Sequence, residues 1–185
     1  MHELLFEKDG LKVRHLQLED KYLIAKWLST PAVLEFYEGR DRPFTLEMVT
    51  EKFFKTEKDI ERCLVKYNDE KIGYIQFYLV NDHTSKIDDY GNGEVVYGMD
   101  QFIGEIKYWN KGIGTLLVKA MVTYLIEHKQ ATIVIMDPQV SNSRALKCYE
   151  KCGFKKVRLL PKNEFHEGQY RDCWLIEYKK CWNTI

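Results

Sequence analysis

The chain has 185 residues, 45% of which are apolar, and its 28 basic residues balance 28 acidic ones. This length and composition suit one globular domain over residues 1–185. The balanced charge gives no support to a nucleic-acid or membrane partner. The sequence has neither a run of about 18 apolar residues for a membrane span nor a basic and apolar leader for secretion. We expect a cytoplasmic protein and a monomer.

The first half of the chain is predicted to combine hairpins with short helices. The Asp9-Gly10 pair between two apolar runs is a hairpin signal. Pro31 suits the first turn of a helix, and Thr45 suits a helix N-cap. Strands are expected over residues 4–7, 11–16, 62–67 and 72–80, and helices over 20–29, 31–36 and 45–55.

The second half alternates strands with helices after a polar loop over residues 81–92. Strands are expected over 94–103, 132–136, 153–160 and 172–179, and helices over 113–128 and 142–151. This order predicts an α/β fold with a central sheet of mixed direction.

A turn with two glycines precedes the helix over 113–128. The backbone of Lys111, Gly112, Ile113, Gly114 and Thr115 presents N–H groups that have no partner inside the helix, and the helix dipole adds positive potential. Such a turn is suited to phosphate or pyrophosphate. Its spacing is neither the dinucleotide motif nor the P-loop. The alternative is a helix that merely begins with glycines.

Two motifs together resemble a known family. Gly112-Ile113-Gly114, followed by Asn142-x-Arg144-Ala145-x-x-x-Tyr149-Glu150-Lys151-x-Gly153-Phe154, resembles the acetyl-CoA-binding half of the GCN5-related N-acetyltransferases, or GNAT superfamily. Four further segments resemble the aminoglycoside 6′-N-acetyltransferases of that superfamily: residues 33–41, 97–104, 136–138 and 166–168. The resemblance spans about residues 11–180, with the acetyl-CoA-binding core at about 94–154. One departure is Trp109, where the superfamily usually has Gln or Arg.

The resemblance implies a mixed, mostly antiparallel sheet flanked by helices and acetyl-CoA as co-substrate. It implies that Phe102 and Ile103 lend backbone groups to the pantetheine amides. Asn142 is either a helix N-cap or a cofactor contact, and the two roles are compatible. Tyr149 is implied as the general acid near the thioester sulfur. The alternative for Tyr149 is a packed core tyrosine.

The acceptor side is expected to be acidic. Asp100 lies in an otherwise apolar strand, where an unpartnered carboxylate is costly. It is interpreted as the group that binds the reacting ammonium and accepts its proton, and the alternative is a structural salt bridge. Asp137 follows the next strand and is expected to form an acidic floor with Asp100, unless it only starts a turn. The other expected substrate-binding residues are Tyr37, Glu38, Asp41, Tyr97 and Glu167.

Other types of site find no support in the sequence. The five cysteines form no CxxC pair or Cys/His cluster, so we expect free thiols and no metal. His166 has no cysteine or histidine at ligand spacing and is expected in a loop without a metal or catalytic role. The acids Asp82, Asp88 and Asp89 are expected in a solvated loop.

The sequence therefore predicts an enzyme that acetylates the 6′-amine of polycationic aminoglycosides by direct attack in a ternary complex, and so confers resistance. One alternative keeps the chemistry and changes the acceptor to a polyamine or a protein N-terminus. Another is an acetyl-CoA-binding module without turnover.

Overall fold

One eight-stranded sheet organises the computed structural model, which describes residues 4–55, 59–81, 90–91 and 93–180. The strands are β1 (Leu4–Lys8), β2 (Leu11–His15), β3 (Ile60–Tyr67), β4 (Glu70–Leu79), β5 (Val96–Ile103), β6 (Ile133–Met136), β7 (Lys155–His166) and β8 (Gln169–Lys179). The helices are α1 (Lys21–Trp27), α2 (Pro31–Leu34), α3 (Leu46–Phe54), α4 (Ile113–His128) and α5 (Ser143–Lys151). Two short 3₁₀ turns are η1 (Leu18–Asp20) and η2 (Ile106–Tyr108).

The strand order is β1-β2-β3-β4-β5-β6-β8-β7, and every neighbouring pair is antiparallel except β5 and β6. The mixed, mostly antiparallel sheet that the resemblance implied is therefore confirmed. The single parallel pair follows from α4, which carries the chain from β5 back to the start of β6.

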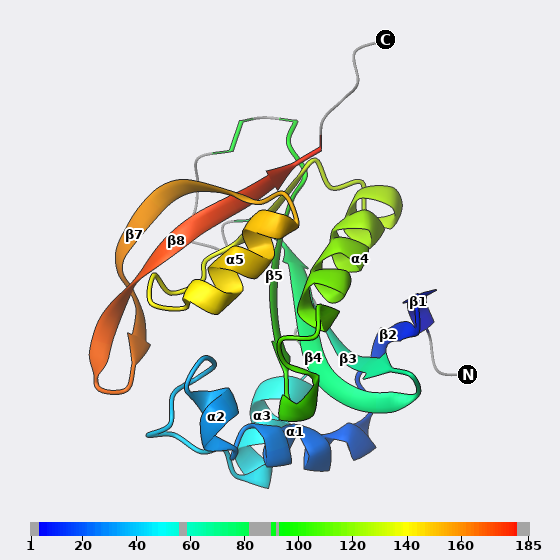
Figure 1. Ribbon diagram of the computed structural model, residues 1–185, viewed down its shortest axis with the longest axis vertical. Coiled ribbons are helices and arrows are strands. Elements are labelled where there is room, and N and C mark those ends of the chain that lie inside the picture. The colour runs from blue at the N-terminus through cyan, green and yellow to red at the C-terminus, as the bar shows by residue number, and fades with distance from the viewer. Residues whose placement is uncertain (1–3, 56–58, 82–89, 92, 181–185) are drawn as a thin grey trace.

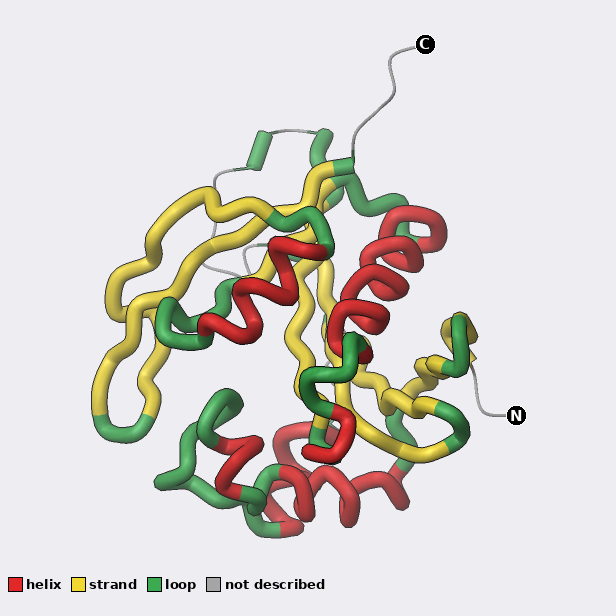
Figure 2. The backbone as a smooth tube through the Cα atoms, in the orientation of Figure 1, coloured by secondary structure: helices red, strands yellow, loops and turns green. Residues whose placement is uncertain are grey.

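Helices cover both faces of the sheet in two groups (Figures 1 and 2). α4 and α5 pack on one face, where Leu117, Met121 and Leu125 of α4 are buried. α1, α2 and α3 pack on the other face around Trp27. Side-chain alternation divides the strands between these cores, because successive residues of a strand point to opposite faces.

Most predicted elements are confirmed, with boundaries that differ by a few residues. Thr45 caps α3 by accepting a hydrogen bond from the Met48 N–H, as its position predicted. The main correction concerns the last two strands, which were expected to stop at 160 and begin at 172. β7 instead continues to His166, and β8 already begins at Gln169. The pairing of the two strands shifts register between Leu160 and Glu164 and then resumes. The polar stretch at this shift had the composition of a loop.

β5 and β6 separate after a short pairing. Only Val96, Tyr97 and Gly98 pair with β6, while the whole of β5 remains paired with β4. The second half of β5 therefore has one free edge, which opens into the interior of the molecule. No described helix is long and apolar enough to cross a membrane.

Candidate active site

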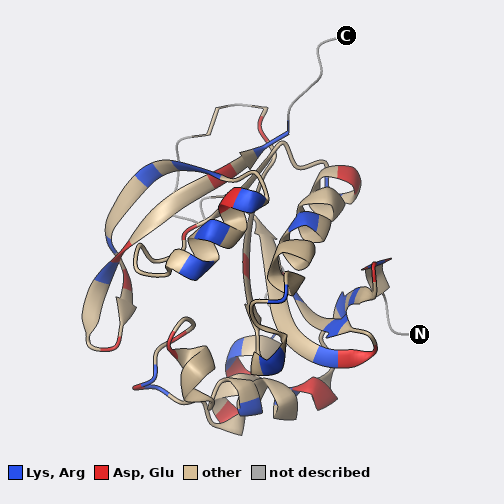
Figure 3. Cartoon of the chain, in the orientation of Figure 1, with Lys and Arg blue, Asp and Glu red and all other residues tan. Residues whose placement is uncertain are grey.

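A cavity of about 1260 Å³ lies where β5 and β6 separate. Its lining comes from the α2 region, the second half of β5, the start of α4, α5 and the end of β7. The charges on its walls are divided. Basic residues of α5 line one part, and Figure 3 marks them in blue along that helix: Arg144, Lys147 and Lys151. Six acidic residues line the rest of the cavity, Glu35, Glu38, Asp100, Asp137, Glu164 and Glu167, together with four further basic residues, Arg40, Lys52, Arg62 and Arg171.

The glycine turn lies at the basic part of the cavity. Gly112 has φ 78°, a conformation that favours glycine, and its carbonyl accepts the first helical hydrogen bond from Leu116. The N–H groups of Ile113, Gly114 and Thr115 therefore have no partner inside α4. Gly112, Gly114 and Thr115 line the cavity, whereas Ile113 is buried in the core and Lys111 is exposed outside the lining. The turn is suited to an anion through its backbone.

Trp109 packs where the superfamily usually has Gln or Arg. Its indole Nε1 donates to the Ile103 carbonyl at 2.8 Å. Its ring lies 4.1 Å from the guanidinium carbon of Arg144, which also stacks on Phe36 at 4.7 Å. Trp109 thus holds a cation of α5 beside the turn by cation–π contact.

The free edge of β5 corrects the predicted role of Phe102. Val80 N–H donates to Val96 and Gly104 N–H donates to Ile72, so the even-numbered residues of β5 direct their backbone groups to β4. Phe102 is one of them, and its side chain is buried against the α1–α3 core. The residues that face the gap are Met99, Gln101 and Ile103, and the Ile103 carbonyl already accepts from Trp109.

Asn142 is the N-cap of α5. Its Oδ1 accepts from the Ala145 N–H at 3.1 Å, as the N-cap interpretation predicted. The residue also lines the cavity, so its amide nitrogen remains compatible with a second contact.

Asp100 lies in the middle of β5 and lines the cavity. Its Oδ2 accepts from Gln76 Nε2 at 2.8 Å, and Gln76 in turn accepts from the Tyr74 hydroxyl at 2.7 Å. No ion pair with Asp100 is found among the described residues, so the salt-bridge alternative is wrong for this part of the chain. Burial raises the pKa of Asp100 to about 6, although the Gln76 hydrogen bond opposes this shift.

Tyr149 extends from α5 to the opposite side of β5. Its hydroxyl accepts from Gln101 Nε2 at 2.8 Å and lines the cavity. Because Gln101 is the donor in this contact, the phenol proton is left for another acceptor. Burial raises the pKa of Tyr149, which keeps the group protonated at neutral pH. The ring of Tyr149 also packs on Phe154, so the residue is a packed core tyrosine whose hydroxyl group reaches the cavity.

Asp137 and Glu164 add two carboxylates near Asp100. Asp137 directly follows β6, and its Oδ2 accepts from Asn163 Nδ2 at 2.8 Å. Burial raises the pKa of Asp137 and of Glu164. The carboxylate cluster explains part of the raised pKa of Asp100, since both neighbours oppose its ionisation.

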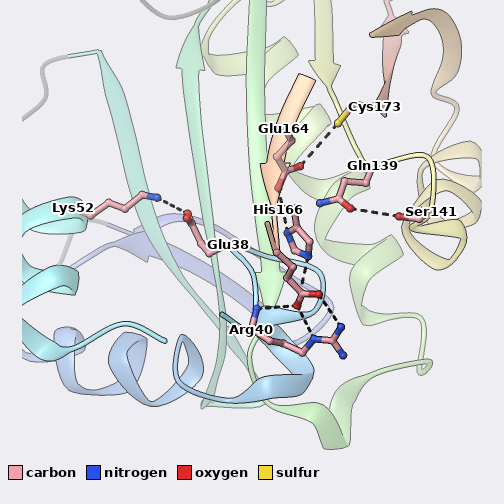
Figure 4. Close-up of polar contacts among 9 residues, drawn as sticks. Glu38, Arg40, Lys52, Gln139, Ser141, Glu164, His166 and Cys173 are labelled. Atoms are coloured by element: carbon pink, nitrogen blue, oxygen red, sulfur yellow. Dashed lines mark hydrogen bonds and ion pairs between the residues drawn. The ribbon is translucent and has the colours of Figure 1, made fainter. Parts of the chain in front are cut away.

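The other predicted acceptor residues have different positions. Tyr37 packs its ring 4.8 Å from that of Phe102 and lines the cavity. Glu38 lines the cavity but pairs with Lys52. The backbone N–H, Nε and Nη2 of Arg40 all donate to the Glu167 carboxylate. These contacts lower the pKa of Glu167 to about 2. Figure 4 shows the ion pair between Glu38 and Lys52 and the contacts that Arg40 makes.

Two of the predicted acceptor residues are not brought to the cavity. Asp41 is exposed and outside the lining. Tyr97 points to the α4 face and packs on Phe77. Asp82, Asp88 and Asp89 lie outside the described residues. Within the described part of the chain, four cysteines are unpaired and no group of His, Cys, Asp or Glu could hold a metal ion. Cys181 is not described.

Sequence reasoning missed the partners of the central groups. Gln76 and Gln101 orient Asp100 and Tyr149, and Arg40 neutralises Glu167. His166 was expected in a loop, yet it ends β7 and is only 4% exposed. The pairing of Gln76 with Asp100 could have been found by aligning the two predicted strands. The contact between Arg40 and Glu167 joins residues 127 positions apart and had no local signal.

Comparison with known proteins gives consistent results. Residues 17–161 match the family model described as "Acetyltransferase (GNAT) domain". Aminoglycoside N(6′)-acetyltransferase type 1 of Klebsiella pneumoniae is 29% identical over 151 residues, covering 80% of this chain and 75% of the relative. A kanamycin resistance protein of Rhizobium radiobacter is 43% identical over 61 residues, which are 33% of this chain and 56% of that protein.

A solved structure is similar over nearly the whole chain. The crystal structure of aminoglycoside acetyltransferase AAC(6′)-Ib in complex with coenzyme A and kanamycin superposes with a TM-score of 0.76 at 26% identity, covering 92% of this chain and 95% of that one.

Proposed function

The chain belongs to the GNAT acetyltransferase family, and we propose that it transfers the acetyl group of acetyl-CoA to the 6′-amine of an aminoglycoside. The amine attacks directly while both substrates are bound. Acetylation removes one positive charge from the antibiotic and adds bulk, which weakens its binding to anionic RNA. The protein would thereby confer resistance.

One observation carries this proposal: the cavity joins an anion-binding end to an end rich in unpaired carboxylates. Acetyl-CoA is an anion with a pyrophosphate, and an aminoglycoside carries several ammonium groups. The free N–H groups of the α4 turn, with the cations of α5, suit the first. The carboxylates of Asp100, Asp137 and Glu164 suit the second.

The proposed proton acceptor, Asp100, and the proposed proton donor, Tyr149, lie on opposite faces of β5. Asp100 binds the 6′-ammonium and accepts its proton, directly or through water, so that the amine is neutral when it attacks. A pKa of about 6 leaves Asp100 ionised at neutral pH, yet close enough to neutrality to act as a base. Tyr149, which retains its proton, donates it to the leaving thiolate.

The cofactor contacts follow the same geometry. The turn from Gly112 to Thr115 holds the pyrophosphate through backbone N–H groups, and Arg144 adds charge from its position on Trp109. The backbone of Gln101 and the N–H of Ile103, on the edge of β5 that β6 leaves unpaired, suit the amides of the pantetheine arm. Asn142 caps α5 and adds an amide beside them.

Two other functions remain as outcomes of the test. A polyamine or a protein N-terminus would use the same cofactor end, but several separated carboxylates suit an acceptor with several ammonium groups better than a peptide with one. A non-catalytic acetyl-CoA-binding module has no need of a carboxylate and a phenol that both line the cavity.

The experiment compares kanamycin, spermidine and a short peptide with a free N-terminus as acceptors. Release of the CoA thiol is followed over time, and mass spectrometry identifies the acetylated product. We expect the highest kcat/KM with kanamycin and an acetyl group on its 6′-nitrogen. A higher kcat/KM with spermidine or the peptide would contradict the aminoglycoside assignment, and binding of acetyl-CoA without transfer would support the non-catalytic module.

A further inference from the structure

Two cysteines lie against the first turn of α4. Cys148 of α5 and Cys152, the C-cap of that helix, are four residues apart, so their side chains leave it on the same face. Figure 1 shows that α5 runs beside α4. Cys148 Sγ lies 3.4 Å from the Thr115 hydroxyl, and Cys152 Sγ lies 3.6 Å from the Thr115 carbonyl oxygen. Both sulfurs therefore contact one residue of the turn that is assigned to the pyrophosphate.

The two thiols differ in their access to the cavity. Cys148 is half-buried and lines the cavity, whereas Cys152 is buried and outside the lining. A Cβ at Gly114 would lie 3.7 Å from Cys148 Sγ, so the glycine brings the backbone of the turn close to this sulfur. A reagent in the basic part of the cavity can therefore reach Cys148 but not Cys152.

The surroundings of Cys148 favour its thiolate, which is the nucleophilic form of cysteine. When Cys148 is ionised, the Cys152 thiol donates a hydrogen bond to its sulfur, and this lowers the pKa of Cys148. Burial opposes the shift, while the Thr115 hydroxyl and the charge of Lys151 support it. The N–H groups that begin α4 add positive potential on the same side.

We propose that Cys148 is a modification site, which forms a mixed disulfide with small anionic disulfides that enter the cofactor end of the cavity. The thiolate of Cys148 attacks one sulfur of the reagent, the S–S bond of the reagent breaks, and the departing thiolate takes a proton from solvent. Cys148 is oxidised and the departing half of the reagent is reduced, so no further oxidant is required. The attached group then occupies the space beside the α4 turn and excludes acetyl-CoA.

The charge of the cavity wall selects the class of reagent. Arg144, Lys147 and Lys151 of α5 line the cavity together with Cys148, whereas Glu150, the one acid of that helix, is outside the lining. The α4 turn adds N–H groups that have no partner inside the helix. A reagent with negative charge is therefore concentrated near Cys148, and one with positive charge is not.

Cys152 does not release the attached group. Cβ atoms four positions apart on a helix are separated by about 5–6 Å, and a disulfide requires about 3.5–4.5 Å. An internal disulfide between Cys148 and Cys152 would therefore require the end of α5 to unwind. Cys152 instead supports the thiolate as a donor, and the mixed disulfide persists until an external thiol reduces it.

The test follows disulfide exchange on the folded protein by mass spectrometry. Oxidised glutathione, which is anionic, is compared with cystamine, which is cationic, and each rate is divided by that of an uncharged cysteine peptide with the same reagent. Every protein carries Cys181→Ser, because Cys181 lies outside the described residues. Cys63 and Cys173 are the internal references, since both are fully buried and burial raises the pKa of both thiols.

We expect one glutathione on Cys148, added about tenfold or more faster than cystamine after this division, with a preference that falls at high salt. Acetyl-CoA at about ten times its Kd should slow the exchange about tenfold by occupation of the site. Cys148→Ser should remove the modification. Equal corrected rates for the two reagents, or exchange at Cys63 or Cys173 as fast as at Cys148, would overturn the proposal.

Variants of Cys152 test the donor without removing the reacting sulfur. Cys152→Ala, checked for its melting temperature, should slow exchange at Cys148 about 2- to 10-fold, because one hydrogen bond to the thiolate is lost. Cys152→Ser retains a donor and should lose less. A glutathione that moves to Cys152, or that disappears in Cys152→Ser, would assign the reaction to the wrong cysteine and overturn the proposal.

Calorimetry of acetyl-CoA before and after glutathione treatment separates this inference from the proposed function. Loss of acetyl-CoA binding in treated wild type, but not in treated Cys148→Ser, supports the site even where no acceptor is acetylated, and that absence of transfer would contradict the proposed function alone. Unaltered acetyl-CoA binding by wild-type protein that carries glutathione on Cys148 overturns the exclusion of the cofactor, even where the untreated enzyme is active.

Discussion

Asp100→Asn separates the basicity of this carboxylate from its shape. The amide oxygen of asparagine can still accept from Gln76, so the hydrogen bond at 2.8 Å is retained while the proton-accepting group is lost. We expect kcat at neutral pH to fall by about 10²- to 10⁴-fold, the usual contribution of a positioned general base. The KM for acetyl-CoA should change little, because Asp100 lies away from the turn that begins α4.

The same substitution should stabilise the fold. Burial raises the pKa of Asp100 from an ordinary 3.8 to about 6, so the folded protein binds this proton more tightly than the unfolded chain. The neutral carboxyl is favourable at low pH, and that stability is lost as the pH rises through 6. The corresponding free energy is about 3 kcal/mol at most. Asp100→Asn should therefore raise the melting temperature at pH 7.5 by up to about 10 °C, and by much less at pH 4.

The assay combines steady-state kinetics between pH 5 and 9 with melting curves at pH 4 and 7.5. In wild type, kcat/KM should fall about tenfold for each pH unit below about 6, as the base becomes protonated. Asp100→Asn should lack this decline. Asp9→Asn, at the exposed turn between β1 and β2, is the matched control. Wild-type kcat in folded Asp100→Asn at pH 6 to 7 would refute the base assignment, and an unchanged or lower melting temperature would refute the burial argument.

Three further substitutions test the neighbouring groups. Tyr149→Phe should lower kcat less than Asp100→Asn does, because water can replace a proton donor for a good leaving thiolate; an equal or larger loss in stopped-flow turnover would contradict this. Asp137→Asn should weaken aminoglycoside binding by about 1–3 kcal/mol, and by less at high salt. Glu167→Gln should weaken binding less than Asp137→Asn does, since Arg40 already neutralises Glu167. Calorimetry that ranks the two variants in reverse would refute the reasoning. Gly114→Ala should raise the KM for acetyl-CoA without unfolding, because the added Cβ would meet Cys148 Sγ at an ordinary 3.7 Å; unchanged kinetics would remove the turn from the site.

The sequence predicted the fold well where local signals were strong. The amphipathic run that became α4, the cap at Thr45 and the Asp9-Gly10 hairpin all depend on residues within a few positions of each other. Both strands of the β7–β8 hairpin were predicted, but their extension to His166 and from Gln169 was missed, because the register shift is stabilised by pairing between the strands and not by local preference. A polar stretch that contains Pro161 carries the composition of a loop, and only the partner strand determines that it continues as a hairpin.

The site was predicted least well where charge compensation decides the role of a residue. Sequence position alone could not distinguish Glu164 from Glu167, since both are acids near the end of the same strand. Arg40 neutralises Glu167 from a loop 127 positions away, while Glu164 contacts Cys173 and His166 and has no lysine or arginine at ion-pair distance among the described residues. The backbone of Phe102 was assigned to the wrong side of β5 for a related reason, because which residues face β4 depends on the pairing register.

The arrangement of the carboxylates also explains how product can leave a site that binds its substrate through several charges. Glu164 and Asp137 would hold ammonium groups that acetylation does not alter, so they bind substrate and product alike and act on KM. In the proposed reaction, Asp100 faces the one nitrogen that loses its positive charge. Its attraction to the acceptor is therefore present before transfer and absent after it, and the proton it accepted must return to solvent before the next turnover. With a pKa of about 6, Asp100 releases that proton readily at neutral pH. A carboxylate neutralised by arginine, as Glu167 is, would be too weak a base to accept the proton at all.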